Sequence, residues 1–162
     1  SVAVVRAIQK LTNIKCDIKW VNDIYLDGKK ICGILTEAVS DFESGILTTV
    51  VVGIGLNVST KEYPEELQEI AGSLLADSVT RNELVAAITE ELFRLAENLE
   101  APELMEEYRA HSCVIGKEIT WLEKDEKKEG FVTGMNAQGH LLVETKDGSV
   151  TLTAGEISVR TK

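Results

Sequence analysis

The sequence predicts an α+β fold, in which a largely antiparallel sheet with helices is followed by a small β-barrel. Strand-like runs in the first half are joined by short connections, which favour antiparallel pairing because parallel strands need a long crossover. An amphipathic helix pattern extends over residues 80–99. After Gly116, five short strand-like runs follow with turn signals about 8–12 residues apart, which is typical of a small barrel or sandwich. These observations divide the chain into residues 1–112 and residues 113–162.

The first half is predicted to contain one helix and three strands. An apolar stripe at helical spacing, made by Val4, Ile8 and Leu11, indicates the helix. Asp27-Gly28 is a hairpin signal, because both residue types tolerate the positive φ of a tight turn. The helix is expected at residues 2–11 and the strands at 17–26, 30–39 and 46–58, with a second turn at 41–45.

Two further helices are predicted before the barrel. Thr80 and Glu83 fit a capping box at the start of the first one, and Pro102 suits the first turn of the second. The acidic stretch 59–73 is either a surface loop that runs into a short helix near residues 65–75, or a mobile lid over a nucleotide. The apolar stripe assigned to the core of the first helix is Leu84, Ile88, Leu92, Leu95 and Leu99.

The last part of the chain is predicted to be a barrel of five strands, with turns at residues 127–130, 136–139 and 147–148. About fifty residues are close to the lower limit for independent stability, so we expect the barrel to lean on the preceding helix. Trp121 is expected in its core. The strands are expected at residues 117–123, 130–135, 140–145, 149–153 and 156–160.

The composition indicates a cytoplasmic globular protein. Of 162 residues, 44% are hydrophobic and 27% are charged, and no apolar run approaches the ~20 residues of a membrane span. Cys16, Cys32 and Cys113 show no close pairing and are expected to be reduced thiols. No secretory leader and no metal-ligand cluster are visible. The net charge of −10 argues against nucleic-acid binding by this chain, because such proteins carry a basic surface.

The first candidate functional stretch is Lys19-Trp20-Val21-Asn22-Asp23. Ile18 and Trp20 share one face of an alternating run, so Lys19 faces the other way. A lysine in this position either covers apolar surface with its stem while its head lies in water, or is held ready for an anion.

The second candidate stretch is Gly53-Ile54-Gly55-Leu56-Asn57, which follows three valines, Val50 to Val52, that we expect to form a buried strand. The two glycines remove side chains from one face, which suggests close approach of a ligand or of another backbone. The amide of Asn57 offers an acceptor and two donors, which suit the N6/N7 edge of adenine.

Together with Gly33-Ile34-Leu35-Thr36-Glu37, these stretches resemble the class II synthetase-like catalytic domain of the bacterial biotin protein ligases. The family pattern is Lys-Trp-Pro-Asn-Asp, Gly-Ile-Leu-x-Glu and Gly-x-Gly-x-Asn, and this chain departs from it at Val21. The ending Gly155-Glu156-Ile157-Ser158-Val159-Arg160 is similar to that of the family's SH3-like C-terminal domain. The upstream biotin loop of the family, Gly-Arg-Gly-Arg-x-Gly-Arg, is absent. The sequence therefore resembles the C-terminal part of a ligase.

The resemblance implies an ATP-dependent reaction that joins biotin to a lysine of the biotin carboxyl carrier protein domain of acetyl-CoA carboxylase. Biotin and ATP would be substrates, and biotinyl-AMP the intermediate, with Mg²⁺ on the phosphates. No metal ligands are implied in the chain itself. The implied site residues are Lys19 for catalysis and biotin binding, Gly53, Gly55 and Leu56 for biotin binding, and Asn57 and Arg160 for nucleotide binding.

Alternatives remain open at this point. The chain could be a non-catalytic adenylate-binding or assembly fragment, or a relative of the lipoate ligases, and Arg160 could be only an exposed terminal arginine. Because the family's upstream segment is absent, we expect the chain alone to be inactive. We also expect it to self-associate, as a homodimer for example, through an open sheet edge and bare apolar surface.

Overall fold

The computed structural model describes residues 1–41 and 47–159. The helices are α1 (Val2–Thr12), the short η1 (Glu65–Leu67), α2 (Arg81–Ala96) and α3 (Pro102–Ala110); the strands are β1 (Asp17–Lys19), β2 (Asp23–Leu26), β3 (Lys29–Ser40), β4 (Leu47–Leu56), β5 (Glu118–Glu123), β6 (Glu126–Met135), β7 (Leu141–Thr145), β8 (Gly148–Leu152) and β9 (Ile157–Val159).

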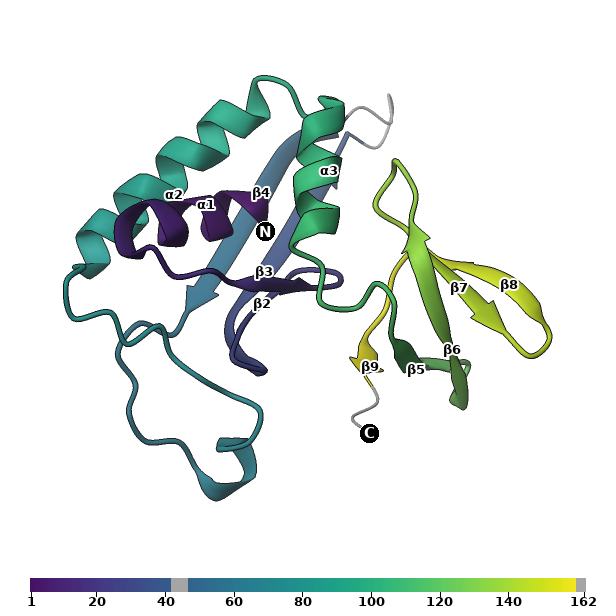
Figure 1. Cartoon of the computed structure of the whole chain (residues 1–162). Helices are drawn as coiled ribbons and strands as arrows, with labels where there is room; N and C mark the ends of the chain where they lie inside the picture. The colour runs from purple at the N-terminus through teal and green to yellow at the C-terminus, as the bar shows by residue number, and fades with distance from the viewer. Residues whose placement is uncertain (42–46, 160–162) are drawn as a thin grey trace.

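Two antiparallel sheets are connected through α3 (Figure 1). The first has the order β1-β2-β3-β4, and α1 and α2 pack together against it. The second, called the small barrel below, has the order β8-β7-β6-β5-β9. This arrangement confirms the predicted α+β fold with a small SH3-like domain at its C-terminal end.

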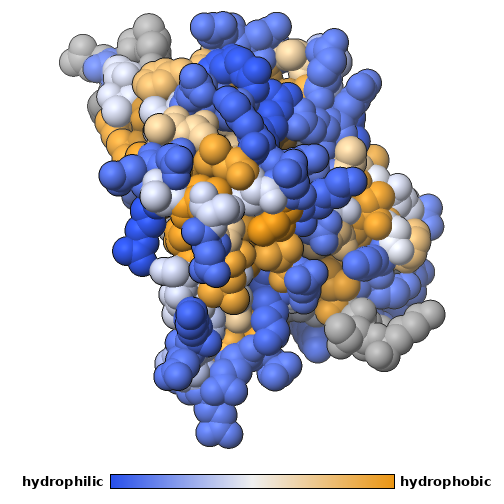
Figure 2. All heavy atoms as spheres, turned by 60° about the vertical axis from the view of Figure 1, so that its left-hand side comes forward, coloured by the Kyte–Doolittle hydropathy of each residue, from blue (hydrophilic) through white to orange (hydrophobic). Residues whose placement is uncertain are grey.

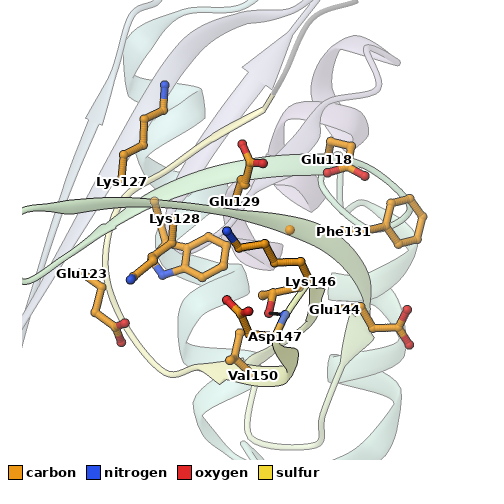
Figure 3. A pocket seen from close by; sticks show the side chains of 13 residues that line it. Glu118, Glu123, Lys127, Lys128, Glu129, Phe131, Glu144, Lys146, Asp147 and Val150 are labelled. Carbon is orange, nitrogen blue, oxygen red and sulfur yellow. Dashed lines mark hydrogen bonds between the residues drawn. The ribbon is translucent and has the colours of Figure 1, made fainter.

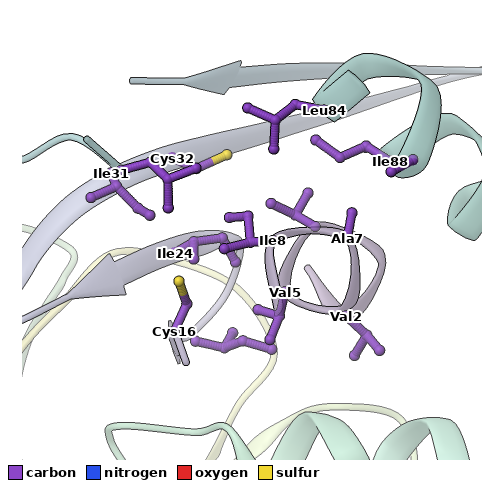
Figure 4. Close-up of a cluster of buried hydrophobic side chains, with 14 residues drawn as sticks. Val2, Val5, Ala7, Ile8, Cys16, Ile24, Ile31, Cys32, Leu84 and Ile88 are labelled. Atoms are coloured by element: carbon purple, nitrogen blue, oxygen red, sulfur yellow. The ribbon is translucent and has the colours of Figure 1, made fainter. Parts of the chain in front are cut away.

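The main core is built around α1. The predicted stripe of this helix is confirmed, and Ile8 at its centre has no exposed surface. Burial of one such side chain is worth about 1.5–3 kcal/mol. Figure 4 shows Ile8 near side chains from the sheet and from α2, among them Ile24, Cys32, Leu84 and Ile88. This core fixes one face of the first sheet.

The hairpin between β2 and β3 forms at Asp27-Gly28 as predicted, with φ values of 51° and 79°. The single strand predicted over residues 17–26, in contrast, is wrong. The chain reverses at residues 20–22, so β1 pairs with β2 and Lys19 lies opposite Asp23. The alternating pattern missed the reversal because side chains keep a period of two on both arms of a tight hairpin.

β4 is an edge strand, because among the described residues it pairs only with β3. The prediction that its valines are buried is wrong: Val50, Val51 and Val52 are 49%, 54% and 42% exposed. A run of valines is buried only where other elements cover both faces of the sheet. Hydrophobic residues reach the surface between polar ones in Figure 2. The predicted turn at 41–45 lies, apart from Asp41, outside the described residues.

The helices after the sheet follow most of the sequence signals. Thr80 caps α2 in a capping box with Glu83, and Pro102 occupies the first turn of α3, as predicted. The prediction that Leu99 belongs to the core stripe of this helix is wrong, because Leu99 follows the end of α2 and is 67% exposed. Within residues 59–73 the only helix is the single turn η1, instead of a helix extending to residue 75. Among the described residues, no helix is long and apolar enough to cross a lipid bilayer.

The small barrel has the five predicted strands, but β6 begins earlier than expected. The turn before it is formed by Lys124 and Asp125, with φ values of 50° and 66°, so the turn predicted at 127–130 is wrong. Gly130 lies inside β6, where a Cβ atom would be 2.6 Å from the carbonyl oxygen of Glu144. This glycine permits β6 and β7 to approach closely. Trp121 is 9% exposed and belongs to the barrel core, as predicted.

A charged network joins the three helices. Arg6 of α1 donates from Nε to both carboxylate oxygens of Glu107 on α3, at 2.8 and 3.0 Å. Its Nη1 lies 3.7 Å from Glu91 of α2, which is 4% exposed and also pairs with Arg94. The hydrogen bonds and charge of Arg6 lower the pKa of Glu107. Arg6 therefore stabilises two carboxylates from different helices.

Replacement of Arg6 by methionine should lower the free energy of unfolding by about 2 kcal/mol, because it leaves buried Glu91 with less compensation. Urea unfolding would measure this loss. Lys10→Met is the matched control, since Lys10 pairs with Glu90 between the same helices at an exposed site and should cost under ~1 kcal/mol. The Arg6 contribution should be present above pH ~4.5 and be lost as the pH falls through the lowered pKa of Glu107. Equal losses for the two variants would contradict this assignment.

Candidate functional site

Two neighbouring rows of residues cross the first sheet and face opposite sides. In antiparallel pairs, directly opposed residues project from the same face. One row is Ile18, Ile24, Cys32 and Leu56, and its members pack in the main core. The other row, called the glycine row below, is Lys19, Asp23, Gly33 and Gly55. The register therefore collects charged side chains and bare backbone on the face turned away from the main core.

The glycine row forms part of a hollow of about 310 Å³. Gly33 and Gly55 line it from the sheet, and Leu67 and Ile70 line it from the segment 59–73. A Cβ atom at Gly55 would lie 3.8 Å from its nearest neighbour, the carbonyl oxygen of Gly33, so packing within the described chain leaves room for a side chain there. The predicted close approach of a ligand or of another backbone to Gly55 stays a prediction.

Lys30 is a site residue that the sequence reasoning missed. It lines the hollow, and its Nζ lies 2.7 Å from Oδ1 of Asp23. Its Cε would be 3.2 Å from a Cβ atom at Gly33, so the lysine passes over the glycine row. The register of β2 and β3 shifts between Ile24 and Tyr25, which places Lys30 on the face of Gly33 despite the odd spacing. A β-bulge of this kind carries no clear sequence signal.

Lys19 lies on the predicted face but at the end of the glycine row farthest from Gly55. Its Nζ is 3.3 Å from the hydroxyl of Tyr25 and 5.3 Å from the centre of that ring. It does not line the hollow. The structure thus presents two lysines on one face, of which Lys30 is the nearer to the glycines.

The remaining predicted residues fall in different places. Gly53 shares the face of Gly55, two positions along β4. Leu56 lies in the opposite row, with its side chain packed against the main core. Asn57 lines the hollow, and its Nδ2 donates to the carbonyl oxygen of Gly72 at 3.0 Å. Arg160 lies outside the described residues.

The segment 59–73 is held against the sheet by several hydrogen bonds. The backbone of Lys30 donates to Ile70 and accepts from Gly72, each at 2.9 Å. The hydroxyl of Tyr63 lies 2.7 Å from the Gly72 carbonyl oxygen and 2.6 Å from Oγ of Ser73. Leu67 and Ile70 remain 38% and 57% exposed. The segment therefore presents apolar side chains beside the hollow.

Other groups offer less chemistry. Burial raises the pKa values of the Cys16 and Cys32 thiols to about 11, so both are protonated at neutral pH. Among the described residues, no group of three histidines, cysteines or carboxylates is placed to hold a metal ion. A second hollow of about 540 Å³ lies in the small barrel, and Lys146, Asp147 and Glu129 are among the side chains that line it (Figure 3).

Comparison with known proteins matches both parts of the chain. Residues 1–57 match the Biotin/lipoate A/B protein ligase family, and residues 114–160 match the Biotin protein ligase C terminal domain. The chain is 31% identical over 169 residues to the bifunctional ligase/repressor BirA of Bacillus subtilis, covering 98% of this chain and 51% of that protein. It is 33% identical over 146 residues to the biotin–[acetyl-CoA-carboxylase] ligase of Mycobacterium tuberculosis, covering 86% and 52%.

Comparison of the fold with solved structures also finds biotin protein ligases. The biotin protein ligase of Aquifex aeolicus in complex with biotin and ATP superposes with a TM-score of 0.76 at 28% identity, over 99% of this chain and 68% of that one. The chain spans about half the length of the curated relatives it matches. Because sequence and fold agree over both sheets, the chain belongs to the biotin protein ligase family.

Proposed function

We propose that this chain forms part of an ATP-dependent ligase that attaches biotin to a biotin carboxyl carrier protein. The observation that carries the proposal is the glycine row, where two lysines flank exposed backbone beside a hollow. One matched curated relative and the matched solved structure are named as biotin ligases, which supports biotin as the substrate. The match of residues 114–160 to the biotin ligase C-terminal domain favours biotin over lipoate.

The proposed reaction has two steps. A carboxylate oxygen of biotin attacks the α-phosphorus of ATP, the bond to the bridging oxygen breaks, and pyrophosphate leaves. The amine of the carrier lysine then attacks the acyl carbon of biotinyl-AMP, and AMP leaves. Both steps concentrate negative charge at one phosphate, so a fixed cation beside it lowers the barrier. Mg²⁺ bound to the phosphates of ATP would supply further charge neutralisation.

Lys30 is the cation that we place nearest the reacting phosphate. It lines the hollow beside Gly33 and Gly55, and Asp23 fixes its head at 2.7 Å. A lysine held in this way needs little reorganisation when charge develops. Lys19, which the sequence analysis identified for catalysis and biotin binding, stands at the other end of the row and would act at longer range.

The biotin tail is proposed to lie along Gly53 and Gly55. Leu56 could contribute only through its backbone, because its side chain belongs to the core row. Asn57 borders the same hollow and is proposed to meet the adenine, with Leu67 and Ile70 as the apolar wall of a lid. Arg160 keeps its proposed role at the nucleotide.

The proposed partner is the carrier domain of acetyl-CoA carboxylase, since one matched relative carries that enzyme in its name. Use of ATP and three free thiols suit a cytoplasmic location. A non-catalytic adenylate-binding module is the second candidate, because the roles that we propose for residues of the hollow concern the phosphate and the adenine rather than the biotin rings.

Replacement of Lys30 by methionine in the complete enzyme should slow biotinyl-AMP formation by ~10²–10³-fold, because one preorganised charge is lost. Lys19→Met should cost less, about tenfold, since its head lies farther from the glycines. Pyrophosphate release in single turnovers would measure both rates. Lys29→Met is the control, because the head of Lys29 bonds to the Gln68 carbonyl oxygen outside the glycine row. A large loss with Lys19→Met and none with Lys30→Met would return the main role to Lys19.

Replacement of Asn57 by alanine should raise the Michaelis constant for ATP more than that for biotin, because the lost amide would face adenine. The same amide also holds Gly72, so a control must loosen the segment without touching Asn57. Tyr63→Phe does this by removing a second bond to the same carbonyl oxygen. Equal kinetic effects of the two variants would mean that Asn57 only holds the segment 59–73 in place and does not contact adenine.

The isolated 162-residue chain should not ligate biotin and should self-associate. Biotin must be held with its carboxylate ~3–3.5 Å from the phosphorus, and the rings of biotin need a closed pocket with polar partners. One edge of β4 has no partner strand among the described residues, and together with the exposed valines it offers a surface for a second strand. Light scattering and a single-turnover assay with labelled biotin would test both parts. A monomeric chain that biotinylates a carrier at the rate of the complete enzyme would refute them.

A further inference from the structure

The small barrel meets the first half of the chain at the turn between β6 and β7, residues 136–139. Arg109 of α3 donates from Nε to the carbonyl oxygen of Met135 at 3.1 Å and from Nη2 to that of Asn136 at 3.0 Å. Trp20 donates from Nε1 to the carbonyl oxygen of Gly139 at 2.8 Å. Three backbone acceptors of one short stretch are thus bonded to donors from outside the barrel.

Trp20 makes this contact from within the motif that carries Lys19 and Asp23. Its side chain is 4% exposed and belongs to the barrel core, whereas its neighbour Ile18 belongs to the main core. The prediction that Ile18 and Trp20 share one face of an alternating run is therefore wrong: the two side chains enter different cores. The indole connects the end of β1 to the second domain.

The turn at residues 20–22 is fixed mainly by contacts outside its own hairpin. β1 and β2 have three and four residues, and only three residue pairs join them. A two-stranded ribbon of that size is weak alone. Besides the bond of Trp20, the hydroxyl of Tyr108 donates to the carbonyl oxygen of Val21 at 2.6 Å, and the amide of Ile34 donates to that of Asn22 at 3.0 Å.

The same turn sets the position of the charged pair in the glycine row. Asp23 follows it directly, lies opposite Gly33, and holds the head of Lys30 at 2.7 Å. A displacement of the turn would therefore move Asp23 and loosen Lys30, although among residues 1–41 and 47–159 no hydrogen bond joins either side chain to the small barrel.

We propose that Trp20 is a positioning residue through which the small barrel holds Asp23, and with it Lys30, in the arrangement used for adenylation. The proposal rests on the proposed function for its catalytic consequence. Its structural part concerns this chain alone. Removal of one buried hydrogen bond shifts an equilibrium by about 5–10-fold, and small misplacements at a reacting centre cost up to ~10²-fold in rate.

The chain provides a matched pair of substitutions. Trp20→Phe removes the bond to Gly139 and part of a buried ring, and Trp121→Phe removes a similar part of a ring from the same cluster. The Nε1 of Trp121 has no hydrogen-bond partner in the part of the chain that the structure describes, so its loss reports packing alone. Tyr108→Phe removes a different anchor of the same turn and serves as a second test if Trp20→Phe fails to fold.

Amide NMR spectra of the 162-residue chain test the structural part. Trp20→Phe and Tyr108→Phe should both shift the signals of Asp23, Gly33 and Ile34, and Trp121→Phe should leave them in place. Shifts confined to the barrel in the first two variants would overturn the proposal. This result does not depend on whether the protein ligates biotin.

Kinetics of the complete enzyme test the catalytic part. Trp20→Phe should lower kcat for biotinyl-AMP formation about tenfold with little change in KM for ATP, and Trp121→Phe should change neither. The Trp20→Phe loss should nearly vanish in a Lys30→Met background, because the substitutions act through one group. Additive losses would overturn the positioning role, whereas absence of adenylation in the unmodified enzyme would refute the proposed function instead.

Discussion

The antiparallel register of the first sheet is the constraint from which the candidate site follows. The pairs that align Ile18, Ile24 and Cys32 bury those side chains against α1 and α2. Because side chains alternate between faces, the same pairs align Lys19, Asp23 and Gly33 on the other side. A shift by one residue would expose the core row and bury the charges. The energy of the hydrophobic core thus enforces the position of polar groups that contribute little to stability themselves.

A bulge in β3 interrupts the alternation of side chains at one position and places Lys30 on the face of Gly33. Cys32 and Gly33 pair in regular register with Ile24 and Asp23 on one side and with Leu56 and Gly55 on the other. Tyr25, however, lies opposite Lys30 instead of residue 31. Lys30 therefore joins the glycine row, while both Ile31 and Cys32 remain buried. Burial of two consecutive apolar residues is what a bulge permits and a regular strand does not. The gain is a second cation beside Gly33, held by Asp23.

Local sequence signals predicted the elements whose causes are local. Asp27-Gly28 specifies a tight turn, and Thr80 with Glu83 caps a helix, whatever the rest of the chain does. The failures concern properties that depend on partners distant in sequence. Val51 is exposed because nothing in the described chain covers it, and Trp20 enters the second core because the β6–β7 turn lies beside it. Pattern reading identifies an apolar residue but not which surface will cover it.

The predictions of site residues also succeed for local properties and fail for properties that depend on distant partners. Gly53, Gly55 and Lys19 were found on the predicted face, since alternation within a strand is a local property. Lys30 was missed because the bulge that turns it towards Gly33 depends on pairing with β2. Leu56 was grouped with the glycines by proximity in sequence, yet alternation places its side chain in the core. Resemblance to a motif pointed to β4, and register decides which of its residues face the hollow.

The charge of the chain bears on how the proposed site would attract the proposed substrate ATP. A net charge of −10 repels an anionic nucleotide at long range. At physiological salt the Debye length is about 8 Å, so carboxylates on remote helix surfaces are largely screened from the glycine row. At contact distance Lys30 and Lys19 dominate, and only Asp23 opposes them within the row. Binding should therefore depend on short-range contacts with these lysines and with metal-neutralised phosphates, rather than on steering by the field of the whole protein.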